Sequence, residues 1–264
     1  MILPLLSPDG AKKRIIPRSM RRDWKSVAAR GTMWFLALVV AFVAARYFLS
    51  PVPWLYRMQV LALTRHPFWL RLHIAGGIVT LTLGLFQFMA SLRAVHPLLH
   101  RNLGRLYVAA VLVGGIAGLR LTPDTRVFVA DALNEGKAFD LSPLSPSFLG
   151  YGPSSTYSPS QFFLVMLGFG TLAVAWLFTT TAALVRARQR QFDQHQRWMT
   201  RSYSLTFAAV TVRFVGLPFL VLTRDPVVAI TCTFWSWLLN LAVAEWLLRR
   251  QHARLAQRTV IASP

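Results

Sequence analysis

Residues 96–119 read HPLLHRNLGRLYVAAVLVGGIAGL. A polar cluster opens this stretch, and an unbroken run of apolar and small residues follows Tyr107. A proline suits the first turn of a helix, because the N–H that it lacks would be unpaired there. The stretch therefore predicts a helix that begins near Pro97 and continues across a membrane.

A second stretch, HQRWMTRSY at residues 195–203, repeats this polar cluster. Both copies contain Arg-x-x-x-Arg-x-Tyr, formed by Arg101, Arg105 and Tyr107 and by Arg197, Arg201 and Tyr203. A histidine precedes each copy, His100 in the first and His195 in the second. The repetition predicts two helices that enter the membrane from the same side and at the same depth.

The composition is that of a membrane protein. Of the 264 residues 55% are hydrophobic and 14% are charged, which is too apolar for a soluble domain. The formal charge of +20 would suggest a nucleic-acid partner in a soluble chain, but here the lipid bilayer and its anionic headgroups are the expected partners. The one cysteine, Cys232, excludes an internal disulfide and a CxxC metal site.

Six stretches are long and apolar enough to span a bilayer. They are Gly31–Leu49, Leu72–Leu92, Leu103–Leu121, Phe162–Val185, Tyr203–Leu222 and Val227–Leu248. We therefore expect an all-α, six-span transmembrane bundle. Residues 1–30 would form a basic N-terminal segment, residues 31–250 the membrane domain with an outer loop at 122–160, and residues 251–264 a tail.

The basic residues predict the orientation. Most of the 29 lysines and arginines lie in segments 12–30, 93–105, 186–201 and 249–258, which alternate with the expected outer loops. Lys and Arg gather on the cytoplasmic side of membrane proteins. Both termini are therefore expected in the cytoplasm.

Polar and small residues follow one face of the second span. They are His73, Gly77, Thr80, Gly84, Gln87 and Ser91, at alternating steps of four and three. Similar faces follow the third, fourth and fifth spans. Since lipid offers such groups no partners, we expect spans two to five to form a four-helix core.

These motifs resemble a bacterial membrane-protein family known as domain of unknown function 2306. The matching residues are His73, the cluster from His100 to Tyr107, and the cluster from His195 to Tyr203. The resemblance implies the topology and a bacterial cytoplasmic membrane, and it implies no activity.

Two histidines at matched depth suggest a redox cofactor. His100 and His195 are candidate metal ligands for haem b, because haem iron accepts neutral imidazole. Arg105 and Arg201 could pair with the propionates. A looser analogy to four-helix membrane cytochromes of the b561 type supports this interpretation, in which His73, Tyr107 and Tyr203 complete the candidate cofactor-binding set.

Arg213 suggests an alternative function. It lies about ten residues into the fifth span, where a charge is costly and usually faces a cavity or a partner. A small anion or a quinone carbonyl could satisfy it, so Arg213 joins the candidate binding residues of a binding or transport protein.

The third interpretation is structural: the paired clusters would anchor two helices, with arginines at lipid phosphates and tyrosines at the interface. The sequence contains no HExxH, nucleophile elbow or phosphate loop. Whether the protein is an enzyme is left open.

Overall fold

The structure, a computed structural model, describes residues 24–49, 63, 65–123, 159–216 and 226–262. These ranges contain helices and turns and no β-strand. The chain divides into two compact units, Met1–Phe35 and Leu36–Pro264. The first unit is described only from Trp24 on, where helix α1 (Trp24–Ala45) begins. The candidate core and the candidate site lie in the second unit.

The second unit begins within α1, which a 3-10 helix, η2 (Arg46–Phe48), follows. Tyr47 of η2 is buried. The Nε of Arg71 donates to the backbone oxygen of Tyr47 at 3.3 Å. This contact joins η2 to the next long helix.

The second expected span is shifted towards the N-terminus. Its helix is α3 (Pro67–Gln87), and a short helix, α4 (Ala90–Val95), follows a break at Phe88. The prediction of one helix from Leu72 to Leu92 is therefore wrong at both ends. The physical reason at the start is Pro67, which occupies the first turn and is preorganised for it.

The third expected span begins as Pro97 predicts. Its helix, α5 (Pro97–Leu121), carries that proline in the first turn. Helices α3 and α5 meet backbone to backbone, since a Cβ added at Gly76 would lie 2.8 Å from the Cα of Gly114. Gly77, the residue expected on this face, has nothing within 4 Å of such a Cβ, so Gly76 makes the close crossing.

Helix α8 (Pro159–Arg188) ends in a tight reversal before α9 (Phe192–Thr206). Gln191 donates its N–H to Arg186 at 2.9 Å and Arg190 donates to Ala187 at 3.1 Å, the two bonds of a Schellman cap. Arg190 holds the left-handed position with φ of 61°, where glycine is the usual residue. The reversal places α9 antiparallel to α8.

The fifth expected span is not one continuous α-helix. Helix α9 begins before the predicted start and ends at Thr206, after which come α10 (Ala208–Thr211) and a π-helix, η3 (Val212–Gly216). Thr206 and Thr211 donate their hydroxyls to backbone oxygens four residues earlier, a contact that bends helices. Residues 217–222 of the expected span lie outside the described residues.

Helix α12 (Pro226–Ala262) covers the sixth expected span and continues well into the predicted tail. Most of the expected outer loop, residues 124–158, lies outside the described ranges. Four helices of the described chain are long and apolar enough to cross a membrane: Ala28–Phe48, Pro67–Gln87, Pro97–Leu121 and Met166–Arg188. The protein is therefore an all-helical, multi-pass membrane protein.

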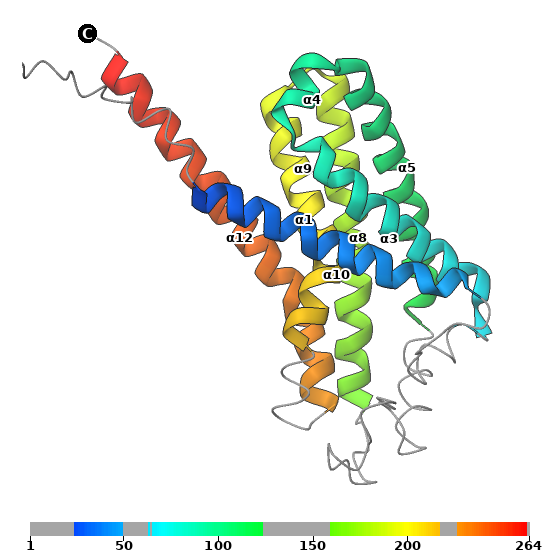
Figure 1. The fold of residues 1–264 in the computed structure, drawn as a ribbon. Coiled ribbons are helices and arrows are strands. Elements are labelled where there is room, and N and C mark those ends of the chain that lie inside the picture. Colours follow the sequence, from blue (N-terminus) through cyan, green and yellow to red (C-terminus); the bar gives the residue numbers. More distant parts are fainter. Residues whose placement is uncertain (1–23, 50–62, 64, 124–158, 217–225, 263–264) are drawn as a thin grey trace, which may run out of the picture. The chain divides into compact units, whose positions relative to one another are not determined.

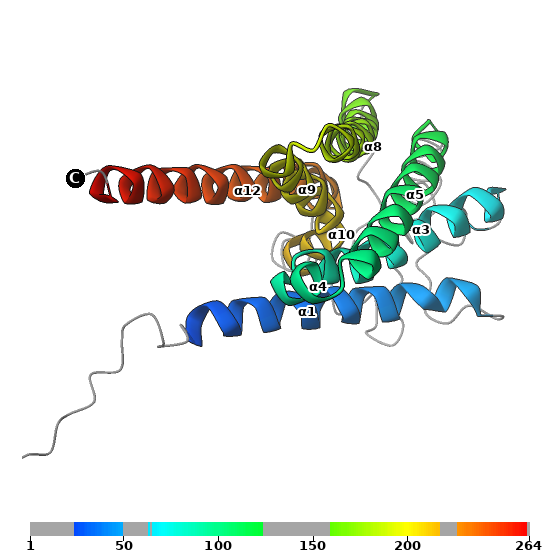
Figure 2. The ribbon, with the colours of Figure 1, turned by 90° about the horizontal axis from the view of Figure 1, so that it is seen from above.

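Four helices pack around one axis in the second unit. Helix α5 contacts α3 and α8, and α9 contacts α8 and α3; Figures 1 and 2 show α3 beside α5 and α8 beside α9. Helices α5 and α9 therefore face each other diagonally, and α12 packs outside against α8 and α9. Figure 1 shows α4 at the end of the bundle where α5 and α9 begin.

Candidate functional site

The centre of the bundle contains a buried hydroxyl network. The hydroxyl of Tyr107 on α5 lies 2.9 Å from the Oγ of Ser202 and 3.1 Å from the Oγ1 of Thr206, both on α9. Tyr107 and Ser202 are fully buried. These contacts join two diagonally opposite helices, so they fix the axial position of α5 relative to α9.

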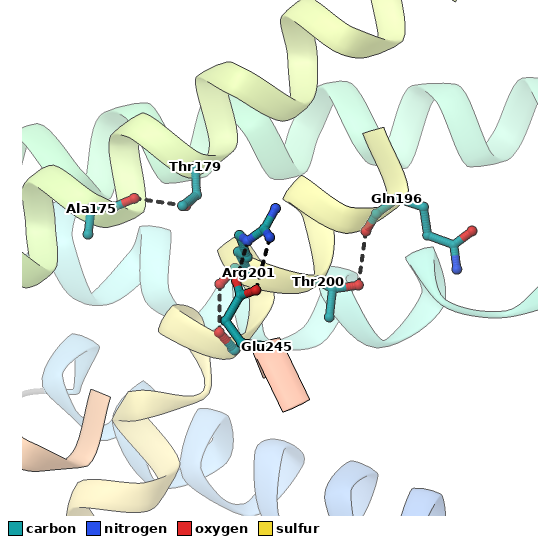
Figure 3. Close-up of polar contacts among 7 residues, drawn as sticks. Ala175, Thr179, Gln196, Thr200, Arg201 and Glu245 are labelled. Atoms are coloured by element: carbon teal, nitrogen blue, oxygen red, sulfur yellow. Dashed lines mark hydrogen bonds and ion pairs between the residues drawn. The ribbon is translucent and has the colours of Figure 1, made fainter. Parts of the chain in front are cut away.

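Helix α8 completes the network. The Oγ1 of Thr180 lies 2.6 Å from the Oγ of Ser202, and the indole of Trp176 donates to Thr206 at 2.8 Å. The adjacent Thr179 donates to the backbone oxygen of Ala175, in its own helix, at 2.8 Å (Figure 3). Thr180 and Trp176 were not among the predicted site residues. A run of threonines in an apolar span was the available signal.

His195 lies on α9 about two helical turns before the network, seven residues before Ser202. Its Nδ1 lies 2.9 Å from the backbone oxygen of Ala183 on α8. A carbonyl oxygen only accepts, so Nδ1 carries the proton. When the ring is neutral, Nε2 then keeps its lone pair, and this nitrogen can bind a metal or haem iron.

His100 lies seven residues before Tyr107, at the same level as His195. Seven residues of α-helix rise about 10.5 Å, so the Tyr107–Ser202 contact brings both rings to one end of the bundle. Arg93 of α4 and Arg101 of α5 add positive charge at this end of the bundle. We therefore place His100 and His195 at the same end of the bundle and call them the histidine pair.

The two rings of the histidine pair differ in their contacts. The Nδ1 of His100 is buried and has no hydrogen-bond partner among the described residues. Gln87 of α3 lies nearby, with its Nε2 3.5 Å from the backbone oxygen of His100. Arg93 of α4 donates to the backbone oxygen of Gln87 at 3.1 Å, which ties α4 to the end of α3 beside His100.

Arg105 and Arg201, the two arginines that the sequence suggests for haem propionates, have partners within the protein. Arg201 forms an ion pair with Glu245 of α12, with Nη2 3.1 Å from Oε2 (Figure 3), and its guanidinium stacks on the ring of Trp198. Arg105 is exposed and donates to Asn102 at 3.4 Å. Arg93 and Arg101 remain as cations at the His100 end of the bundle.

Tyr203 fills the gap between α9 and α3. Its hydroxyl donates to the backbone oxygen of Leu81 at 3.2 Å, and its ring covers Gly84, where an added Cβ would lie 2.2 Å from Cε2. Tyr107 and Tyr203 thus lie deeper than the histidine pair. They form the floor below it.

His73 and Arg213 are placed away from the histidine pair. The Nδ1 of His73 donates to Gly114 at 2.8 Å, and its ring packs against Gly118, 3.0 Å from where a Cβ would be. Gly114 and Gly118 are near the end of α5 opposite to His100. Arg213, on the π-helix, donates to the backbone oxygen of Ala209. The predicted residues therefore divide between two ends of the bundle.

A family model for predicted membrane proteins, domain of unknown function 2306, matches residues 70–134 and 144–248 of this chain. The chain belongs to this family. No curated protein and no solved structure matches it. The matched region of the DUF2306 family contains both histidines of the pair, His73 and the hydroxyl network.

The chemistry of this DUF2306 site is limited by its donors. Within the described ranges no group of three or more His, Cys, Asp or Glu side chains could hold a metal ion. A divalent metal prefers three or four such ligands, and the arginines beside His100 oppose it. Haem iron needs only two axial imidazoles, because the porphyrin supplies the rest, and its propionates are anionic. The histidine pair therefore offers two imidazole donors.

The backbone oxygens of Ala183, Gly114 and Leu81 were not foreseeable from sequence. Every residue carries a carbonyl, so no residue type signals which one a histidine or tyrosine will meet. Arg93 was visible as a basic residue, but its role beside His100 depends on the break between α3 and α4.

Proposed function

We propose that this protein binds one haem b between His100 and His195 and carries electrons at that end of the bundle. The observation that supports the proposal is the pair of imidazoles at one level on diagonal helices, with Nδ1 of His195 held by Ala183. A haem would supply one-electron transfer there. The chain's own residues would hold the two rings, and Arg93 and Arg101 would meet the propionates.

The hydroxyl network supports the same proposal as a positioning device. Tyr107 and Ser202 join α5 and α9 one level below the histidine pair. A polar contact in a bilayer is kept because lipid offers no alternative partner. The network would therefore hold the two imidazoles at equal depth, and the rings of Tyr107 and Tyr203 would keep water from entering from below.

We propose six crossings of a bacterial cytoplasmic membrane, with both termini in the cytoplasm. Helix α9, α10 and η3 would contribute to the fifth crossing and the first part of α12 to the sixth. The basic segments at 93–105, 186–201 and 249–258 support this orientation. The histidine pair would then lie near the cytoplasmic face, where anionic headgroups and a soluble or quinone redox partner could meet it.

The second candidate function is binding of a quinone or small anion near Arg213. The observation in its favour is the π-helix that carries Arg213, since such turns are frequent at functional sites. His73, whose Nδ1 donates to Gly114, could offer its Nε2 as an acceptor to the same ligand. Arg213 could donate to a carbonyl or an anionic oxygen of the same ligand.

The optical spectrum of purified protein tests the haem proposal. Protein from haem-replete cells should show a Soret band that shifts on dithionite reduction, and the band should weaken strongly in His195→Ala. His96→Ala is the matched control, because His96 is exposed at the start of α5. Colourless, monodisperse protein would overturn the proposal and leave the Arg213 site as the better candidate.

The second candidate has its own test. Arg213→Gln should then weaken binding of a ubiquinone analogue, measured by fluorescence quenching, with little loss of folded yield. Arg120→Gln, at the exposed end of α5, is the control. An equal loss in both variants would count against this candidate.

A further inference from the structure

Two arginines at the basic end of the second unit each stack on a tryptophan. The Cζ of Arg201 lies 4.7 Å from the ring centroid of Trp198 on α9. The Cζ of Arg250 lies 3.8 Å from the ring centroid of Trp246 on α12. A guanidinium stacked by its face keeps the N–H groups in its plane available for an anion. The two stacks can therefore be compared by what those N–H groups meet.

The first stack has its anion within the described part of the chain. Arg201 donates from Nε and Nη2 to the carboxylate of Glu245 (Figure 3). Arg250 and its neighbour Arg249 are exposed and form no ion pair with any residue that the structure describes. No described carboxylate therefore meets the N–H groups of Arg250 as Glu245 meets those of Arg201.

The contacts between α9 and α12 place further cations beside Arg249. Glu245, Arg249 and His252 follow one another at steps of four and three, so they share one face of α12. At one end of this face Glu245 pairs with Arg201. At the other end His252 contacts the guanidinium of Arg197. Arg249 therefore lies along the seam between the two helices, with Arg197 and Arg201 across from it.

The surface of α12 just before Arg250 is apolar. Val243, Trp246 and Leu247 are 47%, 49% and 51% exposed. Arg250 lies one turn beyond Trp246 and just past Leu248, where the expected sixth span ends. Tryptophan is enriched at this boundary between hydrocarbon and headgroups. A phospholipid presents both a phosphate and apolar chains to such a surface, whereas a free anion presents only charge.

We infer that Arg249 and Arg250 bind the phosphate of an anionic phospholipid, whose acyl chains lie along the apolar side of the same helix. The phosphate meets Arg250 as the carboxylate of Glu245 meets Arg201. Arginine pairs with phosphate through two parallel N–H···O bonds, and basic surfaces between membrane helices bind anionic headgroups. The bound lipid offsets the repulsion among the cations along the seam and so stabilises the packing of α12 on α9. This inference goes beyond the proposed function and is independent of any cofactor.

Thermal unfolding of the purified full-length protein in a neutral detergent tests the inference. Phosphatidylglycerol should raise the Tm in a concentration-dependent way, and phosphatidylcholine with the same acyl chains should not. Inorganic phosphate at the same concentration should leave the Tm unchanged, because it lacks the chains. Half-maximal stabilisation should need about fivefold more phosphatidylglycerol in Arg250→Gln and about 30-fold more in Arg249→Gln/Arg250→Gln, since each basic residue at an anionic surface contributes a factor of about five.

Arg105→Gln is the matched control, because Arg105 is exposed at the same end of the bundle but on α5. It should respond to phosphatidylglycerol like the wild type, and an equal loss of response in it would overturn the inference. So would an equal response of the wild type to both lipids or to inorganic phosphate, or an unchanged response of the double variant. Arg250→Lys keeps the charge without the planar fork and should fall between Arg250→Gln and the wild type. Should the glutamine variants fail to fold, Arg250→Lys and the three probes on the wild type still decide.

Discussion

At Gly84 two tyrosine rings meet the backbone of α3. A Cβ added there would lie 2.2 Å from Cε2 of Tyr203 and 3.3 Å from Cε2 of Tyr107. Both rings are buried and each uses its hydroxyl across the bundle. The absence of a side chain at this one residue therefore lets the two tyrosines close the floor of the candidate site.

Gly84→Ala should destabilise the protein. The methyl group must push aside a packed ring, and overpacking of this kind costs about 1–3 kcal/mol. Gly77→Ala is the matched control, since an added Cβ meets nothing within 4 Å and alanine is the better helix former by about 1 kcal/mol. Thermal unfolding in detergent should show a lower Tm for the first variant and an equal or higher Tm for the second. A Tm for Gly84→Ala at or above that of Gly77→Ala would contradict the packing.

At the scale of elements, polar contacts decide how α12 meets the bundle. Glu245 pairs with Arg201 of α9, Thr211 of α10 donates to Asn240 at 2.9 Å, and Asn240 donates to the backbone oxygen of Ser204 at 3.2 Å. Apolar surfaces alone do not set the register of a helix in lipid, because lipid tails are equally apolar. These side chains therefore select one position of α12.

Glu245→Gln should loosen α12, because the charge of Arg201 then lies between helices without its carboxylate. We expect a loss of roughly 1–2 kcal/mol, at the upper end of polar contacts between membrane helices. The exchange Arg201→Glu with Glu245→Arg should recover part of that loss. Unfolding midpoints of the single and double variants form a double-mutant cycle. Strictly additive effects would show that the pair does not couple the helices.

At the scale of the whole molecule, the surface of the second unit is apolar where a bilayer would lie. Large side chains that are well exposed occur along α5 and α8, among them Leu106, Ile116, Val174 and Phe178. Soluble proteins rarely expose such continuous apolar surface. The polar groups of these helices face inward instead, as the hydroxyl network shows.

Cysteine labelling tests the proposed orientation of the molecule. Gln189→Cys lies in the turn between α8 and α9, and Pro123→Cys lies just beyond α5; both positions are exposed. In a Cys232→Ser background, a membrane-impermeant maleimide should label Pro123→Cys in intact cells and Gln189→Cys only after permeabilisation. The opposite pattern would reverse the orientation, and labelling of both in intact cells would contradict the topology.

The predictions from sequence were most accurate where the signal is local. Apolar length and the proline at position 97 predict where the third helix forms, because hydropathy and the missing N–H act within a turn or two. The long third helix and the start of the last follow from such signals. The breaks after Gln87 and Thr206 were missed, since threonine back-bonding and helix ends depend on neighbours.

The candidate site divides in the same way. The sequence by itself determined that His100 and His195 each precede the same cluster near the start of a helix, and hence that they could lie at the same depth. Only the tertiary structure decided that Arg201 pairs with Glu245 while Arg93 approaches His100, and that the carbonyl of Ala183 holds His195 alone. Every residue has a backbone carbonyl, and the chain has many arginines that could pair with Glu245. Which carbonyl and which arginine are used therefore depends on how the helices cross.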